Sequence, residues 1–148
     1  MTIQRFLLFC LLATITAAAA AKDIQVKMLT NGPNGQMLVF DPDFIKANVG
    51  DTVTFLPLQK AGHTSISLLV PEGAKTWKAN PDTQITVTIE KQGVYLVQCD
   101  VHKSLGMVAV IQAGKPVNLA EAKKAAADFS AKMLQNKDRF DKLLAQVK

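Results

Sequence analysis

Three side chains that bind soft metal ions lie within nine residues, in the segment from Cys99 to Met107. Cys99 supplies a thiolate, His102 an imidazole and Met107 a thioether, with the spacing Cys-x2-His-x4-Met. The segment joins two expected strands, and a loop of this kind can curl all three side chains around one point. A thiolate, two imidazoles and a weak axial thioether make up the blue-copper ligand set. The spacing therefore predicts a copper site that needs one further imidazole.

The fourth ligand is expected from His63, the other of the chain's two histidines. It ends the turn-rich stretch Lys60-Ala61-Gly62-His63, which follows an expected strand. We therefore predict one copper ion, cycling between Cu(I) and Cu(II). Its four predicted ligands are His63, Cys99, His102 and Met107.

Each of these residues also has a simpler interpretation, because a lone cysteine, histidine or methionine is more often a packing residue than a ligand. The combined pattern outweighs these interpretations. Zinc is the main rival metal, but a structural zinc site normally closes with a fourth Cys or His, and none remains. With both histidines committed to a closed site, no position is left for a substrate. These features favour one-electron transfer and predict that the protein is not an enzyme. A copper storage or delivery protein is the alternative, and a binding module without metal is a more remote one.

The first 21 residues have the pattern of a secretory signal peptide. Arg5 provides the positive charge, residues 6–15 are mostly apolar, and residues 17–21 are all alanine. We expect cleavage after Ala20 or Ala21, since the apolar run is short for a membrane anchor. Removal of this segment takes Cys10 with it and leaves Cys99 as the single cysteine. The remaining chain carries 16 Lys and Arg against 12 Asp and Glu, a net charge of +4.

Short alternating segments separated by turn residues predict an all-β protein. About eight such segments indicate a β-sandwich, most simply with two Greek-key sheets, over residues 22–114. The expected strands are 24–28, 37–40, 44–49, 52–57, 66–70, 85–89, 94–99 and 107–112.

Residues 115–148 change to helix-forming composition and are expected to pack on the sandwich. Asn118 and Glu121 have the spacing of a capping box at a helix start. We predict two helices, at 118–126 and 129–146, with an apolar stripe facing the sandwich core.

From Lys22 onward the chain resembles the pseudoazurins, a family in the plastocyanin–azurin group of cupredoxins. The resemblance is carried by 50-GDTVTF-55, 60-KAGH-63, 93-GVY-95, the Cys-x2-His-x4-Met loop and the two-helix tail. It implies a cupredoxin-like fold with a type 1 site, in which His63, Cys99 and His102 are equatorial ligands and Met107 is axial. It also implies a periplasmic electron carrier.

The resemblance implies how redox partners dock. His102 would lie at the surface in an apolar patch, for which Val101 and Leu105 are candidates, and would carry electrons in and out. Lysines around it would attract acidic partner surfaces, for example those of a copper nitrite reductase. The candidate lysines are Lys60 and Lys103, with Lys75 and Lys115 as weaker ones. We expect a monomer that neither binds nucleic acid nor inserts into a membrane.

Three positions depart from the usual family sequence. Val101 stands where a proline is common, and Lys103 where an aromatic residue is commoner. Thr64 stands where an asparagine often bonds the thiolate sulfur. Because hydrogen bonding around the sulfur tunes the reduction potential, these changes bear on tuning and leave the ligands intact.

Overall fold

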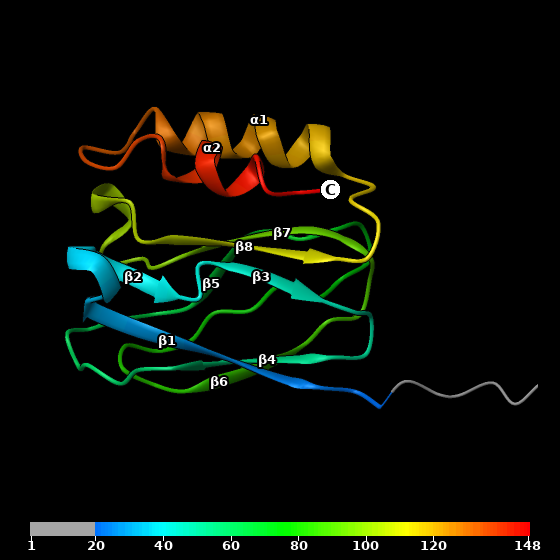
Figure 1. Ribbon diagram of the computed structural model, residues 1–148, viewed down its shortest axis with the longest axis horizontal. Coiled ribbons are helices and arrows are strands. Elements are labelled where there is room, and N and C mark those ends of the chain that lie inside the picture. Colours follow the sequence, from blue (N-terminus) through cyan, green and yellow to red (C-terminus); the bar gives the residue numbers. More distant parts are fainter. Residues whose placement is uncertain (1–19) are drawn as a thin grey trace, which may run out of the picture.

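Eight strands in two four-stranded sheets face one another, and two α-helices cover the outer side of one sheet (Figure 1). This arrangement is taken from a computed structural model that describes residues 20–148. The strands are β1 (Asp23–Asn31), β2 (Met37–Asp41), β3 (Phe44–Ala47), β4 (Thr52–Leu56), β5 (Ile66–Leu69), β6 (Ile85–Thr88), β7 (Gly93–Gln98) and β8 (Val108–Ala113). The helices are α1 (Leu119–Ser130) and α2 (Arg139–Leu144), with short 3-10 turns η1 (Pro33–Gly35) and η2 (Lys103–Leu105). The predicted β-sandwich with a helical tail is confirmed. The predicted signal peptide, apart from Ala20 and Ala21, lies outside the described residues.

The strand order is β2-β1-β4-β6 in the first sheet and β3-β8-β7-β5 in the second. Strands β1 and β4 pair in parallel, as do β3 and β8, whereas the other neighbours are antiparallel. All eight strands expected from the alternation of apolar and polar residues are present, with ends shifted by one or a few residues.

The two central strands of the second sheet are buried on both faces. All six residues of β8 are buried, as are the first five of β7. Successive side chains of a strand point to opposite faces. Tyr95, Val97 and Ile111 therefore enter the core between the sheets. Val94, Leu96, Val108 and Val110 enter a second core under α1 and α2. Strands covered on both sides read as nearly continuous apolar runs, which is what these sequences show.

This alternation also aims two of the predicted ligands. Cys99 continues the inward-facing series Tyr95–Val97 just past the end of β7, and Met107 precedes the inward-facing Ala109 of β8. Both side chains therefore point into the space between the sheets at one end of the sandwich. The loop that joins them holds His102 and the turn η2.

The predicted second helix, 129–146, is wrong over residues 131–138, which are not helical. Helix α1 continues to Ser130, and α2 begins only at Arg139. Between them the chain passes over the turn η2, and Asn136 adopts a left-handed backbone conformation with φ of 51°. The backbone N–H groups of Leu134 and Gln135 donate to the carbonyl of Ser104. Tertiary hydrogen bonds therefore override a local preference for helix.

The predicted capping box at Asn118 is also wrong in its bonds. Asn118 does stand at the N-terminal cap of α1, but its side chain makes no cap bond to that helix within the described residues. Instead its amide pairs with the backbone of Val94, accepting from the N–H at 2.7 Å and donating to the carbonyl at 2.9 Å. The residue ties the start of the tail to β7.

No helix in residues 20–148 is long and apolar enough to cross a membrane.

Candidate metal centre

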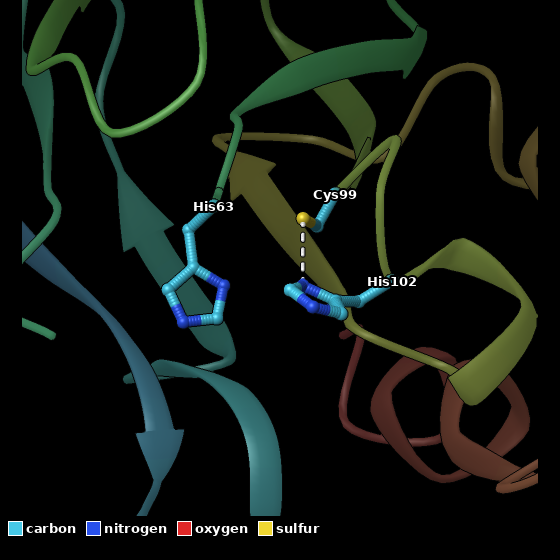
Figure 2. Close-up of side chains that lie close together, drawn as sticks. All are labelled: His63, Cys99 and His102. Atoms are coloured by element: carbon cyan, nitrogen blue, oxygen red, sulfur yellow. Dashed lines mark hydrogen bonds between the residues drawn. The ribbon is translucent and has the colours of Figure 1, made fainter. Parts of the chain in front are cut away.

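His63, Cys99 and His102 come together at the end of the sandwich where β4 and β7 finish (Figure 2). One donor atom from each residue lies within 4.8 Å of the donor atoms of the other two. The two imidazole rings are tilted to one another by 57°, with centroids 4.9 Å apart. A thiolate and two imidazoles at this separation can share one metal ion.

His63 presents an unused nitrogen toward this centre. Its ring is fully buried, and the Nε2 atom lies 3.1 Å from the hydroxyl of Thr30 in β1. Its buried Nδ1 atom has no hydrogen-bond partner among residues 20–148. A buried polar atom without a partner is costly unless something else satisfies it. A bound metal ion would do so, and the Thr30 contact holds the other nitrogen in the manner typical of ligating histidines.

The backbone around His63 is held by one carboxylate. Asp82 accepts hydrogen bonds from the N–H groups of Ala61 at 3.2 Å, and of Gly62 and His63 at 2.9 Å each. Its own N–H donates to the carbonyl of His63 at 2.7 Å. These backbone hydrogen bonds hold the pKa of Asp82 below its usual range. Asp82 therefore holds the His63 turn with both its carboxylate and its backbone N–H before any metal binds.

The sulfur of Cys99 is buried and accepts hydrogen bonds from Thr64. The Thr64 backbone N–H donates to Sγ at 3.4 Å, and the Thr64 hydroxyl lies 3.7 Å from it. That hydroxyl also accepts from the N–H of Asp100 at 2.8 Å. Thr64 therefore supplies hydrogen bonds to the sulfur from both its backbone and its side chain.

His102 is the one candidate ligand that reaches the surface. Its Nδ1 atom lies 3.5 Å from the Cys99 sulfur, and its ring is partly exposed whereas that of His63 is not. Burial lowers the pKa of both imidazoles below the ordinary value, and the neighbouring His102 lowers that of His63 further. The lowered pKa values favour the neutral form of both rings, which is the form that binds metal.

Met107 is tied by its backbone to both ligands of the same loop. Its carbonyl accepts from the N–H of Cys99 at 3.0 Å, and its N–H donates to the carbonyl of His102 at 3.3 Å. The side chain is fully buried and belongs to the same core cluster as Cys99. Its thioether is the natural candidate for a fourth, axial ligand.

The candidate docking residues differ in how free they are. Val101 is 55% exposed and Leu105 is half-buried, so both flank His102 at the surface. Lys60 is exposed, but the ammonium of Lys103 pairs with the Asp100 carboxylate at 2.7 Å.

Two of the candidate lysines lie at the far end of the molecule. Lys115 follows the end of β8, about 20 Å along that strand from Met107. Lys75 pairs with Glu90, which follows the end of β6 beyond Thr88. In the β4–β6 pair, Thr88 is opposite Thr52, the first residue of β4, whereas His63 follows the last residue of β4. Lys75 therefore lies at the end of the sandwich opposite to His63.

Sequence reasoning missed the residues that hold the ligands. Thr30 is a polar residue within a β-strand, and Asp82 stands in a turn after Pro81. Neither has a motif at a fixed spacing from His63, so only the folded chain shows that they meet it.

A two-sheet sandwich with a Cys-x2-His-x4-Met loop and a distant histidine at one end is the architecture of a cupredoxin. The model of the family described as "Copper binding proteins, plastocyanin/azurin family" matches residues 26–114. A putative pseudoazurin of Rhizobium leguminosarum bv. viciae is 40% identical over 124 residues, covering 80% of this chain and 81% of that protein. The pseudoazurin of Paracoccus pantotrophus is 36% identical over 138 residues, covering 92% and 91%.

Solved structures give the same result over the whole described fold. The crystal structure of native pseudoazurin from Hyphomicrobium denitrificans has a TM-score of 0.74 and 33% identity, covering 85% of this chain and 98% of that one. A pseudoazurin from Methylobacterium extorquens AM1 has a TM-score of 0.70 and 35% identity, with coverage of 85% and 99%. The chain belongs to the pseudoazurins, within the plastocyanin/azurin family of copper-binding proteins. Its metal is accordingly copper.

Proposed function

We propose that the chain is an exported one-electron carrier with a mononuclear type 1 copper site formed by His63, Cys99, His102 and Met107. The observation that carries the proposal is the convergence of two imidazoles and a thiolate within 4.8 Å, with the buried Nδ1 of His63 lacking any other partner in residues 20–148. Copper bound there would supply a one-electron couple between Cu(I) and Cu(II).

The burial of the ligands supports electron transfer over catalysis. His63, Cys99 and Met107 are fully buried, so a substrate in solution has no access to their donor atoms. The partly exposed His102 provides a short route for an electron between a docked partner and the centre. Backbone hydrogen bonds hold Cys99, His102 and Met107 to one another, so these residues would offer nearly the same donors to both oxidation states of a bound copper ion.

We expect the partners to be redox proteins with acidic faces, for example a copper nitrite reductase. They would dock over His102 and Val101, with the exposed Lys60 providing attraction. Attraction between lysines and carboxylates raises the encounter rate without demanding tight binding. We expect the carrier to act as a monomer in the periplasm.

The first experiment adds Cu(II) to the purified chain and records the visible spectrum. We expect an intense thiolate-to-copper band that a reductant bleaches and an oxidant restores. Cys99→Ser should abolish the band. Met107→Leu should shift the band and the reduction potential, whereas Met133→Leu, a matched change at a buried methionine under the helices, should change neither.

A copper storage or delivery protein is the alternative that this experiment separates. A colourless protein that holds Cu(I) tightly and exchanges it with a chelator would favour storage or delivery. Rapid, reversible colour change without copper release supports the carrier.

Export is tested by sequencing the N-terminus of the protein recovered from the periplasm. We expect it to begin at Ala21 or Lys22. Lys22 is already anchored to the sandwich, because its backbone N–H donates to the Asp51 carboxylate at 2.9 Å and its carbonyl accepts from Thr52 at 2.8 Å. A start well inside β1 or a retained residue 1 would contradict the proposed signal peptide.

A further inference from the structure

The connection between α1 and α2 lies directly on the metal-binding loop. Ser104, in the turn η2 between His102 and Met107, offers a carbonyl that accepts two backbone hydrogen bonds from this connection. The N–H of Leu134 donates at 2.7 Å and that of Gln135 at 3.2 Å. The tail thus makes polar contact with the loop as well as covering the apolar face of β7 and β8.

The next two carbonyls of the loop are bound by side chains of the same tail. The amide Nδ2 of Asn136 donates to the carbonyl of Leu105 at 2.8 Å. The Nη1 atom of Arg139, at the start of α2, donates to the carbonyl of Gly106 at 2.6 Å. Three consecutive carbonyls leading to Met107 are therefore all held by one segment of the tail.

Arg139 also reaches the opposite sheet. Its Nη1 atom donates to the carbonyl of Leu38 at 2.9 Å, and its Nη2 atom to that of Met37 at 3.4 Å, both in β2. Strand β2 belongs to the first sheet, whereas the metal-binding loop joins β7 and β8 of the second. One planar guanidinium therefore ties the loop to the far wall of the sandwich, and its charge strengthens each hydrogen bond.

Gly106 has little freedom to move away from this contact. Its backbone is left-handed, with φ of 78°, and a Cβ atom there would lie 2.8 Å from the Cβ of Asn136. Met107 follows directly, and its backbone bonds with Cys99 and His102. A displacement of Gly106 would therefore move the thioether relative to both ligands.

We propose that Arg139 is a positioning residue for the copper centre: by binding the Gly106 and Leu38 carbonyls together, it sets where the Met107 thioether stands. The inference rests on the ligand set of the proposed function. The axial thioether is the weakest ligand, and the axial ligand tunes the reduction potential. Its position is therefore the one most dependent on the backbone that carries it.

The test compares three variants of the copper-loaded chain. Arg139→Gln removes the charge and the fork. Arg139→Lys keeps the cation but loses the planar fork, whose second nitrogen reaches the Met37 carbonyl. Lys142→Gln is the control, since Lys142 lies on the same helix, is exposed, and pairs with the Asp138 carboxylate at 2.6 Å. The measurements are the absorption and EPR spectra of the Cu(II) form, the reduction potential, and amide hydrogen exchange in the Cu(I) form.

We expect Arg139→Gln to shift the spectra and the potential, Arg139→Lys to fall between it and wild type, and Lys142→Gln to match wild type. Loss of a charge-assisted hydrogen bond should make local opening about tenfold easier, so the amide of Met107 should exchange about tenfold faster. A spectrum and potential unchanged in Arg139→Gln, with faster exchange, would overturn the proposal and leave Arg139 as a purely structural contact.

Two further measurements keep the outcome decisive. If Arg139→Gln does not fold, Asn136→Ala removes the neighbouring hydrogen bond to Leu105 from an exposed side chain and should give a smaller shift of the same sign. An unshifted spectrum in that variant would count against the proposal. If wild type shows no thiolate-to-copper band, the proposed function fails, whereas exchange at Met107 in the metal-free variants still decides whether Arg139 holds the loop.

Discussion

The Cys99 sulfur accepts two hydrogen bonds from Thr64. Thr64 gives the sulfur a backbone N–H at 3.4 Å, which any residue except proline would supply, and a hydroxyl at 3.7 Å, which few residue types would supply. The hydroxyl is oriented by the Asp100 N–H, which donates to it at 2.8 Å. The backbone bond secures the sulfur, and the side chain is left to tune it.

Thr64→Val should lower the reduction potential while leaving copper bound. A hydrogen bond to a thiolate withdraws electron density from the sulfur and favours the reduced metal, so its loss favours the oxidised form. A long hydrogen bond of this kind is worth roughly 0.5–1.4 kcal/mol, which for one electron corresponds to roughly 20–60 mV. Redox titration measures the shift, and Thr64→Ser, which keeps the hydroxyl, is the control. A potential that does not fall in Thr64→Val would show that the hydroxyl has no influence on the sulfur.

At the scale of single residues, the ligands could be found from the sequence, whereas their supports could not. Cys99, His102 and Met107 have a fixed spacing in one loop, and His63 is the other histidine in the chain. Asp82 and Arg139, in contrast, lie 19 and 33 residues from the backbone atoms that they bind next to the centre. Nothing in a single sequence marks such a pair, because the contact is created by the crossing of loops in three dimensions.

At the scale of elements, the turn η2 and the α1–α2 connection are built against one another. Gly106 ends η2 in a left-handed conformation, and its missing side chain is what lets Asn136 approach. Gly35, at the end of the turn η1, has a similar φ of 73°, but beyond its chain neighbours no atom of residues 20–148 lies within 4 Å of a Cβ built there. A side chain at Gly35 would therefore meet only backbone strain, whereas a side chain at Gly106 would meet both backbone strain and a close contact.

Gly106→Ala should destabilise the fold more than Gly35→Ala. The change at Gly35 costs about 1 kcal/mol, because only the left-handed backbone is strained. At Gly106 the same strain is joined by displacement of Asn136, and we expect about 2–4 kcal/mol in total. Urea unfolding of both variants measures the difference. Equal losses would mean that the connection yields freely to the added methyl group.

Sequence patterns predict best those elements that pack a regularly spaced set of side chains against the core. The strands follow from alternation, since each has one or two buried faces at period two. The segment 131–138 has good helix formers, but it is drawn out of helix by hydrogen bonds to Ser104. Asn118 has the residue type of a cap, but its amide is used by Val94. Local patterns fail where a polar contact with a distant loop takes precedence.

Asp51 makes a pH-dependent contribution to the stability of the fold, because its carboxylate connects the start of the sandwich at Lys22 to the turn before β4. Its carboxylate accepts from the N–H groups of Lys22 and Asn48, which hold its pKa below the ordinary value. A carboxyl with a lowered folded pKa stabilises the fold above its unfolded pKa of about 3.9, and that contribution is lost as the pH falls through the folded value. Asp51→Asn should therefore be less stable than wild type at pH 7, and the gap should narrow below about pH 4. Urea unfolding across this range tests it; a gap independent of pH would assign the effect to shape alone.

At the scale of the whole molecule, the arrangement separates a redox end from a structural end. The ligands, Val101 and Lys60 lie at one end of the sandwich, while Lys115 lies at the other. The expected net charge of +4 is modest, so the total charge by itself does little to steer a charged partner toward the protein. The position of each positive charge relative to His102 then matters more than the sum.

Lys60→Glu and Lys115→Glu change the net charge by the same amount at opposite ends, and this makes them a matched pair. With ferricyanide as an anionic oxidant of the reduced protein, Lys60→Glu should slow the second-order rate by roughly two- to tenfold at about 0.1 M salt, because the approach to His102 becomes less attractive. Lys115→Glu, beyond the far end of β8 and about 20 Å from Met107, should change the rate much less, since the Debye length at this salt concentration is about 10 Å. Stopped-flow rates at several ionic strengths measure both, and the gap between the variants should close as salt is raised. Equal slowing by the two changes would mean that total charge, and not the face around His102, governs the encounter.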